Sequence, residues 1–145
     1  MAKFHYKFES IKKVKEALEK KAQKEVAVID LEIQKLENEY KRLTELELKS
    51  KKEFVKIQVS VGELKFMKGY ELFLQKQREA ITKKINNLNE KKKIKLKELL
   101  KRSQEHKIFD ILEEHHHTEF NIEQNKLELD QINEIATQKF ARQAK

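Results

Sequence analysis

Three consecutive histidines, His115, His116 and His117, follow Glu113 and Glu114 and are the residues best suited to metal chemistry in this chain. Two Glu-x-x-His spacings occur here, and di-iron helical bundles use this spacing on two of their helices. Such a site needs further carboxylates from other helices, and nothing in the sequence supplies that second set. Adjacent helical residues also point about 100° apart, so three adjacent histidines cannot share one ion. We therefore expect exposed histidines on an acidic helix face and no bound metal.

The run from Lys91 to Lys97 contains five lysines and is the candidate site for phosphate groups of a nucleic acid. It has no interleaved aromatic residues, and the acidic residues 25–48 are available to neutralise it. Bulky apolar residues are too sparse around the run for a helix that lies on a membrane surface. We therefore expect intramolecular neutralisation and no nucleic-acid partner, with nucleic-acid binding by residues 83–102 as the alternative.

Catalytic motifs are missing from the sequence. It has no cysteine, no glycine-rich phosphate loop and no nucleophile with a suitable base. Two-helix coiled coils also lack concave, dry pockets. We therefore expect a protein that is not an enzyme and has no cofactor, with no catalytic, cofactor-binding or metal-binding residues.

The composition of the 145 residues is typical of long helices. Charged residues make up 40% of the chain and hydrophobic residues 38%, with no proline and two glycines. A compact globule needs more turn residues than this, whereas coiled coils do not. No stretch approaches the roughly 18 apolar residues of a transmembrane helix, and the N-terminus lacks the apolar run of a secretory signal. We therefore expect a cytoplasmic protein.

The charges are arranged in blocks that alternate in sign. Residues 1–24 have a net charge of +5, and residues 25–48 have a net charge of −4. Residues 80–103 have a net charge of +7, and residues 104–127 have a net charge of −4. If the chain folds back near residue 64, each basic block faces an acidic block, whereas a parallel, in-register dimer would bring like charges together. The pattern predicts an intramolecular hairpin that is a monomer.

Apolar residues recur at the spacing of a left-handed coiled coil, about 3.5 residues. In the first half of the chain this seam consists of Ala22, Val26, Ile29, Ile33, Leu36, Tyr40 and Leu43. The two glycines, Gly62 and Gly69, mark a turn, and Ser10 is the candidate N-cap of the first helix. We predict an all-α fold, a single long antiparallel two-helix coiled-coil hairpin. Helix one covers about 5–58, the turn about 59–67 and helix two about 68–143.

Two apolar groups exceed what one seam can bury. From about residue 128 onward, helix two extends past the start of helix one and has no partner. One side of this overhang carries Leu129, Ile132, Ile135, Ala136 and Phe140. Residues 69–81 are the densest aromatic and apolar stretch, and the adjacent Phe73 and Leu74 cannot both face the partner helix. Overpacking beside the turn and a docking patch for another protein are both open explanations for this stretch.

Three local patterns connect the chain to a known family. The start, Phe4-His5-Tyr6-Lys7-Phe8-Glu9-Ser10-Ile11, precedes a helix rich in Lys and Glu, and helix two opens with Tyr70-x-x-Phe73 and Ala80-Ile81. The end contains an acidic stretch, Glu128-Leu129-Asp130-Gln131-Ile132-Asn133-Glu134-Ile135-Ala136, followed by Arg142. These patterns, the length and the hairpin layout resemble the FliJ family of flagellar type III export proteins over nearly the whole chain.

The resemblance implies a role without catalysis. FliJ-like proteins are antiparallel coiled coils similar to the central stalk of rotary ATPases, and they are thought to insert their paired termini into the hexameric export ATPase. They also contact the cytoplasmic part of the membrane export-gate protein and can bind export chaperones. Carried onto this chain, the ATPase-binding end comprises Phe4, Phe8, Ile11, Leu129, Ile132, Ile135, Ala136 and Phe140. The export-gate patch comprises Leu43, Leu46, Tyr70, Phe73 and Ala80.

The expected protein is thus a cytoplasmic stalk and adaptor of flagellar protein export. It lies at the inner face of the cell membrane, at the flagellar base, and reaches the membrane through its partners only. A generic structural tether that dimerises through its seam is a second alternative. Sedimentation equilibrium separates the two, because the hairpin is a monomer.

Overall fold

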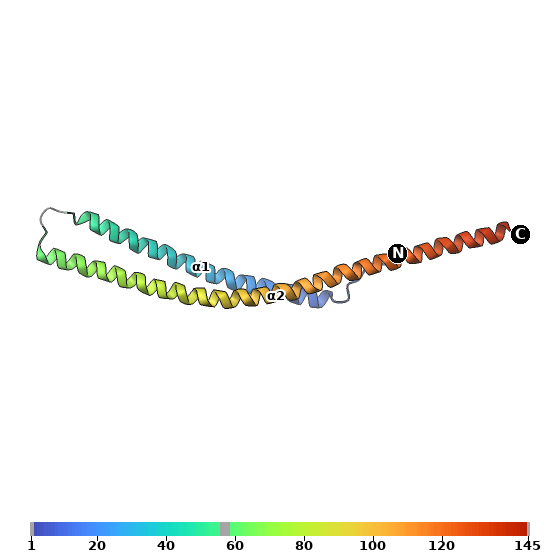
Figure 1. Cartoon of the computed structure of the whole chain (residues 1–145), viewed down its shortest axis with the longest axis horizontal. Helices are drawn as coiled ribbons and strands as arrows, with labels where there is room; N and C mark the ends of the chain where they lie inside the picture. The colour runs from blue at the N-terminus through green and yellow to red at the C-terminus, as the bar shows by residue number, and fades with distance from the viewer. Residues whose placement is uncertain (1, 56–58, 145) are drawn as a thin grey trace. The chain divides into compact units, whose positions relative to one another are not determined.

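The computed structural model describes residues 2–55 and 59–144 of the chain. These residues form two helices, α1 (Glu9–Glu53) and α2 (Val61–Gln143), and contain no strand (Figure 1). The helices pack against each other in opposite directions, which confirms the predicted all-α helical hairpin. The chain divides into two compact units, Lys20–Leu100 and the combination of Met1–Glu19 with Lys101–Lys145.

A single apolar seam holds the unit of residues 20–100 together. Leu43 of α1 forms a buried cluster with Leu74 and Ile81 of α2, and Leu74 is the most enclosed of the three, with 2% of its surface exposed. The buried residues that α1 contributes to this unit are Ala22, Val26, Ile33 and Leu43, all of which belong to the predicted seam. Burial of this one stripe stabilises the pair of helices.

Ion pairs between the helices flank the seam of this unit. Glu25 pairs with Lys95 at 3.0 Å, and Asp30 pairs with Lys92 at 2.6 Å. Further along, Glu47 of α1 pairs with Arg78 of α2. Residue numbers therefore rise along α1 as they fall along α2, and acidic residues of 25–48 face basic residues of 80–103, as the charge blocks predicted. Opposite charges at these positions favour this register over its neighbours.

The other unit pairs the two ends of the chain in the same antiparallel sense. Lys12 of α1 forms an ion pair with Glu113 of α2, and Lys15 pairs with Glu105 at 3.2 Å. The basic start of the chain thus faces the acidic block of residues 104–127, which is the second pairing that the charge pattern predicted.

Helix α1 is shorter than the predicted range 5–58. It begins at Glu9, and the carbonyl of Phe8 accepts the backbone N–H of Lys12 at 2.9 Å. Phe8 is therefore the N-cap position, and the assignment of Ser10 to it is wrong. Residues 4–8 alternate aromatic and polar side chains, a period of two that is typical of extended backbone and not of a helix. At the other end α1 stops at Glu53, and the predicted helical residues 56–58 lie outside the described residues.

Helix α2 begins at Val61, so the predicted turn at 59–67 is wrong for most of its length. The hydroxyl oxygen of Ser60 accepts the backbone N–H of Glu63 at 3.1 Å. Ser60 and Glu63 have the Ser-x-x-Glu spacing of a capping box, which marks the start of a helix. The prediction of a turn relied on the two nearby glycines and overlooked this spacing. Gly62 lies in the first turn, outside the helix interior where glycine is most costly.

The end of α2 extends past all other parts of its unit. Gln124 is the last half-buried residue, and every described residue after it is exposed. In Figure 1 the red end of α2 runs on alone to its last residue, Gln143. The overhang that was predicted from about residue 128 thus begins at Asn125, and it is roughly 28 Å long at about 1.5 Å per residue.

Candidate functional site

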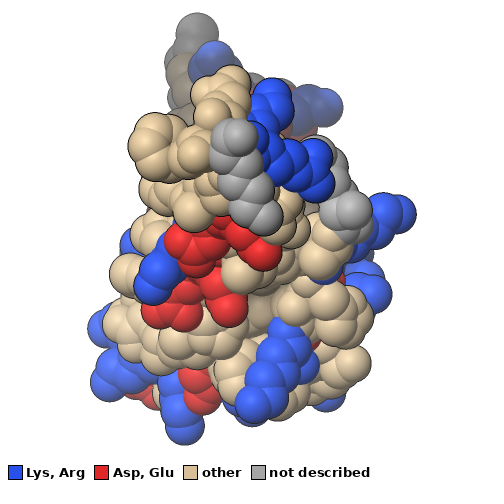
Figure 2. Space-filling model, turned by 90° about the vertical axis from the view of Figure 1, so that its right-hand side faces the viewer, with Lys and Arg blue, Asp and Glu red and all other residues tan. Residues whose placement is uncertain are grey.

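The overhang of α2 exposes an apolar stripe. We call this stripe the tail face, and it consists of Leu129, Ile132, Ile135, Ala136 and Phe140. Its four large side chains are 56–74% exposed. Steps of three and four residues place them on one side of the helix. An apolar side of this kind stabilises a helix only when a partner covers it. Figure 2 looks at the right-hand side of Figure 1, and much of the surface in view consists of uncharged side chains around a group of Asp and Glu.

The first residues of the chain cover a different part of α2. The rings of Phe4 and His117 meet edge to face with their centroids 4.8 Å apart, and Phe120 lies 5.5 Å from Phe4. The ring of Tyr6 lies 5.7 Å from that of His116. Such edge-to-face contacts stabilise aromatic pairs beyond the area that they bury.

Phe8 completes this aromatic cluster. Its ring lies 6.0 Å from His116 and 6.2 Å from Phe109. The cluster therefore combines three rings from the extended N-terminal segment with four rings from α2: Phe4, Tyr6, Phe8, Phe109, His116, His117 and Phe120. It fixes the N-terminal segment against α2 ahead of the first turn of α1.

Tyr6 is the most buried member of the cluster, with 5% of its surface exposed. Its hydroxyl donates a hydrogen bond of 2.8 Å to the backbone carbonyl of Phe109. Burial raises the pKa of this hydroxyl, and the nearby Glu113 carboxylate raises it further. Tyr6 therefore remains a protonated donor at neutral pH, and it anchors the segment that the sequence had assigned to a helix.

The three histidines are not all exposed, in contrast to the prediction. His115 and His117 are exposed, as predicted, but His116 is half-buried between the rings of Tyr6 and Phe8, so the prediction of a fully exposed run is wrong. The alternation of Phe4, Tyr6 and Phe8 was the signal that could have shown an extended N-terminal segment with its rings on one side. The described residues contain no group of three His, Asp or Glu side chains that could hold a metal ion.

Polar contacts surround the aromatic cluster. Lys12 forms a hydrogen bond with Glu113, which raises the pKa of the lysine, and it also pairs with Asp110 at 3.4 Å. His106 lies between two carboxylates, with its Nδ1 2.6 Å from Glu19 and its Nε2 3.6 Å from Asp110. These contacts join the first turns of α1 to α2.

The Lys15–Glu105 pair makes this junction sensitive to acid. Its hydrogen bond lowers the pKa of the Glu105 carboxyl. Glu105 therefore stabilises the fold above its unfolded pKa of about 4.3, and this contribution is lost as the pH falls through the lower, folded-state value. We expect Glu105→Gln to unfold at lower urea concentration than wild type near pH 7. The difference between the two curves should narrow in a second measurement at a pH low enough to protonate Glu105 in the folded protein.

The matched control for this experiment is Glu119→Gln, which removes the same charge from an exposed residue of α2 that pairs with no other described residue. Its urea midpoint should differ from that of wild type by the same small amount at both pH values. A Glu105→Gln midpoint that stays below wild type by an equal amount at both pH values would contradict the assignment.

The structure separates the predicted export-gate patch into two groups. Leu43 is buried in the seam, and Leu46 and Tyr70 are half-buried against the same cluster. Phe73 and Ala80 are exposed, Phe73 with 56% of its surface. Of the adjacent pair that could not both face α1, Leu74 faces it and Phe73 points away. Only Phe73 and Ala80 are therefore available to a partner as the structure stands.

The residues of the predicted ATPase-binding end also differ in their exposure. Phe4 and Phe8 are half-buried in the aromatic cluster, and Ile11 is exposed on α1. The five residues of the tail face are all exposed. The structure thus brings Phe4 and Phe8 together against residues 109–120 of α2 and leaves the tail face uncovered.

Two lysines of the basic run pair with α1, which agrees with intramolecular neutralisation. They are Lys92, bound to Asp30, and Lys95, bound to Glu25 and, at 3.6 Å, to Glu98 of its own helix. Contact with Glu25 raises the pKa of Lys95. The remaining lysines of the run, Lys91, Lys93 and Lys97, are exposed.

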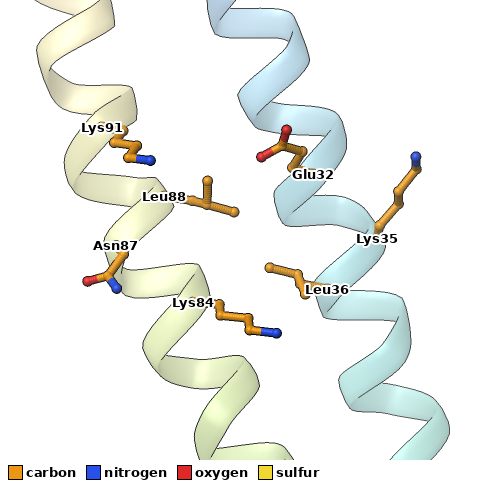
Figure 3. Close-up of a pocket in the computed structure, with 7 residues that line it drawn as sticks. All are labelled: Glu32, Lys35, Leu36, Lys84, Asn87, Leu88 and Lys91. Atoms are coloured by element: carbon orange, nitrogen blue, oxygen red, sulfur yellow. The ribbon is translucent and has the colours of Figure 1, made fainter.

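An open groove lies beside this run in the unit of residues 20–100. Figure 3 shows Leu36 of α1 and Leu88 of α2 pointing toward each other across the seam. The other residues that line the groove are Glu32, Lys35, Lys84, Asn87 and Lys91. Its floor is the apolar seam itself and its rim is charged, so the groove is a gap in coiled-coil packing and its residues suggest no particular ligand.

No helix in the described part of the chain combines the length and the apolar character needed to cross a membrane. Neither a curated protein nor a solved structure matches the sequence. Residues 4–145 match the protein family described as Flagellar FliJ protein, which is essentially the whole chain. The chain therefore belongs to the FliJ family, and this membership implies a role related to flagellar export.

Proposed function

We propose that this protein is a stalk and adaptor of flagellar export, and that its tail face docks into the hexameric export ATPase. The observation that supports the proposal is the overhang of α2, in which every described residue after Gln124 is exposed while apolar side chains follow one side. An amphipathic helix with an uncovered apolar side is typical of a protein–protein interface.

The N-terminal residues have a supporting part in this proposal. Phe4 and Phe8 hold the start of the chain against α2, close to where the overhang begins, and Ile11 remains exposed beside them. The overhang then enters the ring as a single helix whose base is held by the aromatic cluster. Its effect on the ATPase would be allosteric, because a stalk that binds one state of the ring more tightly than another shifts the ring toward that state.

The export gate and the export chaperones are the other proposed partners. Phe73 and Ala80 would form the contact surface for the cytoplasmic part of the gate protein. Leu43, Leu46 and Tyr70 would contribute indirectly. They pack in the seam and so hold this part of α2 in position for the contact. In this proposal the protein works as a monomer without a cofactor, on the cytoplasmic side of the membrane at the flagellar base, through its role as an adaptor and not through catalysis.

The experiment that tests the docking proposal is a triple substitution in the tail face, Ile132→Ser, Ile135→Ser and Phe140→Ser. We expect this tail triple variant to bind the hexameric export ATPase at least about tenfold more weakly than wild type, because several interface anchors are lost together. Binding is measured by pull-down and by titration with the purified hexamer. The helical circular dichroism signal should be unchanged, because these three side chains are exposed and lie outside the core of the described residues.

A double variant of α1 is the matched control. Val28 and Leu31 are also more than half exposed, and Val28→Ser with Leu31→Ser changes apolar surface of the same kind outside the tail. It should bind the hexamer as wild type does. Equal binding by the tail triple variant and wild type would exclude the tail face as the docking surface.

A further inference from the structure

The first turns of α2 project beyond the end of α1. Helix α1 stops at Glu53, and Lys51 in its last turn reaches Glu71 at 3.5 Å. Glu71 follows Val61 by about ten residues, so α2 begins roughly 15 Å before this point at about 1.5 Å per residue. Figure 1 shows the green start of α2 reaching past the last turn of α1. Helix α1 therefore does not reach the turns from Val61 to Phe66.

These turns carry three exposed apolar side chains. Val61 is 71% exposed, Leu64 51% and Phe66 66%. We call these three residues the helix tip. At about 100° per residue, Leu64 points about 300° and Phe66 about 140° around the helix from Val61. A partner helix or a groove covers one side of a helix, so it cannot cover all three, whereas an apolar phase that surrounds the end of the helix can.

Exposed lysines lie within and behind the helix tip, with Lys65 between Leu64 and Phe66 and Lys68 two residues after Phe66. Lys65 and Lys68 of α2 are exposed, as are Lys49 and Lys52 near the end of α1, and none of the four pairs with another described residue. Residues 49–68 contain six lysines against two acidic residues, one of them Glu63 in the capping box. Long lysine side chains can lie along apolar surface while their ammonium groups reach phosphates.

We propose that the helix tip inserts end-on into the surface of an anionic phospholipid bilayer. The helix rises about 7–8 Å from Val61 to Phe66, which matches the depth of about 5–10 Å at which apolar groups lie in the interfacial layer. Lys65 and Lys68 lie about 6 Å and about 10 Å from Val61 along the helix axis, so their long side chains can reach the lipid phosphates, where basic residues are attracted to anionic headgroups. The proposal is independent of docking to the ATPase, which uses the other end of α2.

Phe66→Trp provides a direct probe, because the chain has no tryptophan of its own. We expect its emission to shift to shorter wavelength, and to be quenched by brominated acyl chains, when vesicles of phosphatidylcholine and phosphatidylglycerol are added. Vesicles of phosphatidylcholine alone should have little effect. Phe140→Trp is the matched control, since Phe140 is 74% exposed near the other end of the same helix, and its emission should not shift.

A triple substitution measures the contribution of the helix tip to binding. Val61→Ser, Leu64→Ser and Phe66→Ser leave the net charge unchanged, so a general attraction of a chain of charge +8 to anionic vesicles cannot cause the difference. We expect this tip triple variant to bind phosphatidylglycerol vesicles at least about tenfold more weakly than wild type in a flotation assay. The tail triple variant should bind them as wild type does.

Several outcomes would overturn the proposal. They are no binding of wild type to phosphatidylglycerol vesicles, equal binding by the tip triple variant, or no spectral shift of Phe66→Trp. If the tip triple variant instead loses binding to the export-gate protein while vesicle binding is unchanged, the helix tip contacts a protein and not lipid. The tip triple variant is also titrated with the export ATPase, which it should bind as wild type does, so failure of this proposal can be distinguished from failure of the docking proposal.

Discussion

Leu74→Ala should destabilise the unit of residues 20–100 by roughly 2–5 kcal/mol, the usual cost of a large-to-small change in a core. Leu74 is 2% exposed and packs with Leu43 and Ile81 in a buried cluster between α1 and α2. A two-helix coiled coil has no second layer that can collapse into the cavity. The melting temperature, followed by circular dichroism, should fall by at least roughly 8 °C, because 1 kcal/mol shifts it by about 4–8 °C in a unit of this size.

Leu72→Ala is the matched control for this change. Leu72 lies two positions earlier on the same helix and is 56% exposed, so the same atoms are removed from an exposed position. Its stability should stay within about 0.5 kcal/mol of wild type. If Leu72→Ala and Leu74→Ala melt at the same temperature, the seam of α2 does not run through Leu74.

Tyr6→Ala should detach the N-terminal segment from α2 without unfolding the remainder of the chain. The substitution removes the ring that packs on His116 and Phe8, and it removes the hydrogen bond to the Phe109 carbonyl. A buried aromatic change of this kind costs roughly 3–5 kcal/mol in a core, and here the loss is confined to a local opening. Amide hydrogen exchange in the first turns of α1 should accelerate at least about tenfold.

Two variants separate the causes of this effect. Tyr6→Phe keeps the ring and loses only the hydrogen bond, so it should cost about 0.5–1.5 kcal/mol. Tyr40→Ala removes the same side chain from an exposed position on α1 and should leave exchange in the first turns of that helix unchanged. Wild-type exchange rates in Tyr6→Ala would show that the aromatic cluster does not hold the segment.

The pairing of the helices could be predicted from charge because it depends on many residues that act together. Lys12 faces Glu113 and Asp30 faces Lys92, as the alternating blocks require. No single ion pair of this kind contributes much to stability, but a shift of the whole register would oppose like charges along both helices. Such a pattern is visible in the sequence before any contact is known.

The ends of the helices could not be predicted in the same way because single contacts decide them. One hydroxyl, that of Ser60, starts α2 within a stretch whose valines and glycine suggested a turn. At the start of the chain, Tyr6 gains more from packing against α2 than from extending α1. Helical propensity changes by less than about 1 kcal/mol per residue for such residues, so tertiary contacts override it.

The candidate sites were predictable where the seam leaves an apolar residue without a partner. This argument identified the tail face, and it also required that either Phe73 or Leu74 be exposed. The export-gate patch came instead from the family resemblance, and it included Leu43, which the apolar spacing had placed in the seam, together with Leu46 and Tyr70, which are half-buried against that seam. Their burial depends on the rotation of each helix, which only the packed structure fixes.

The antiparallel pairing has a consequence for the order in which the protein folds during synthesis. Lys51 and Glu71 are separated by about twenty residues, whereas Lys12 must wait for Glu113, which follows it by 101 residues. At about 5–20 residues per second, that delay is roughly 5–20 s on the ribosome. The hairpin therefore closes from its turn toward its ends. The first residues of the chain leave the ribosome first but are the last to pack.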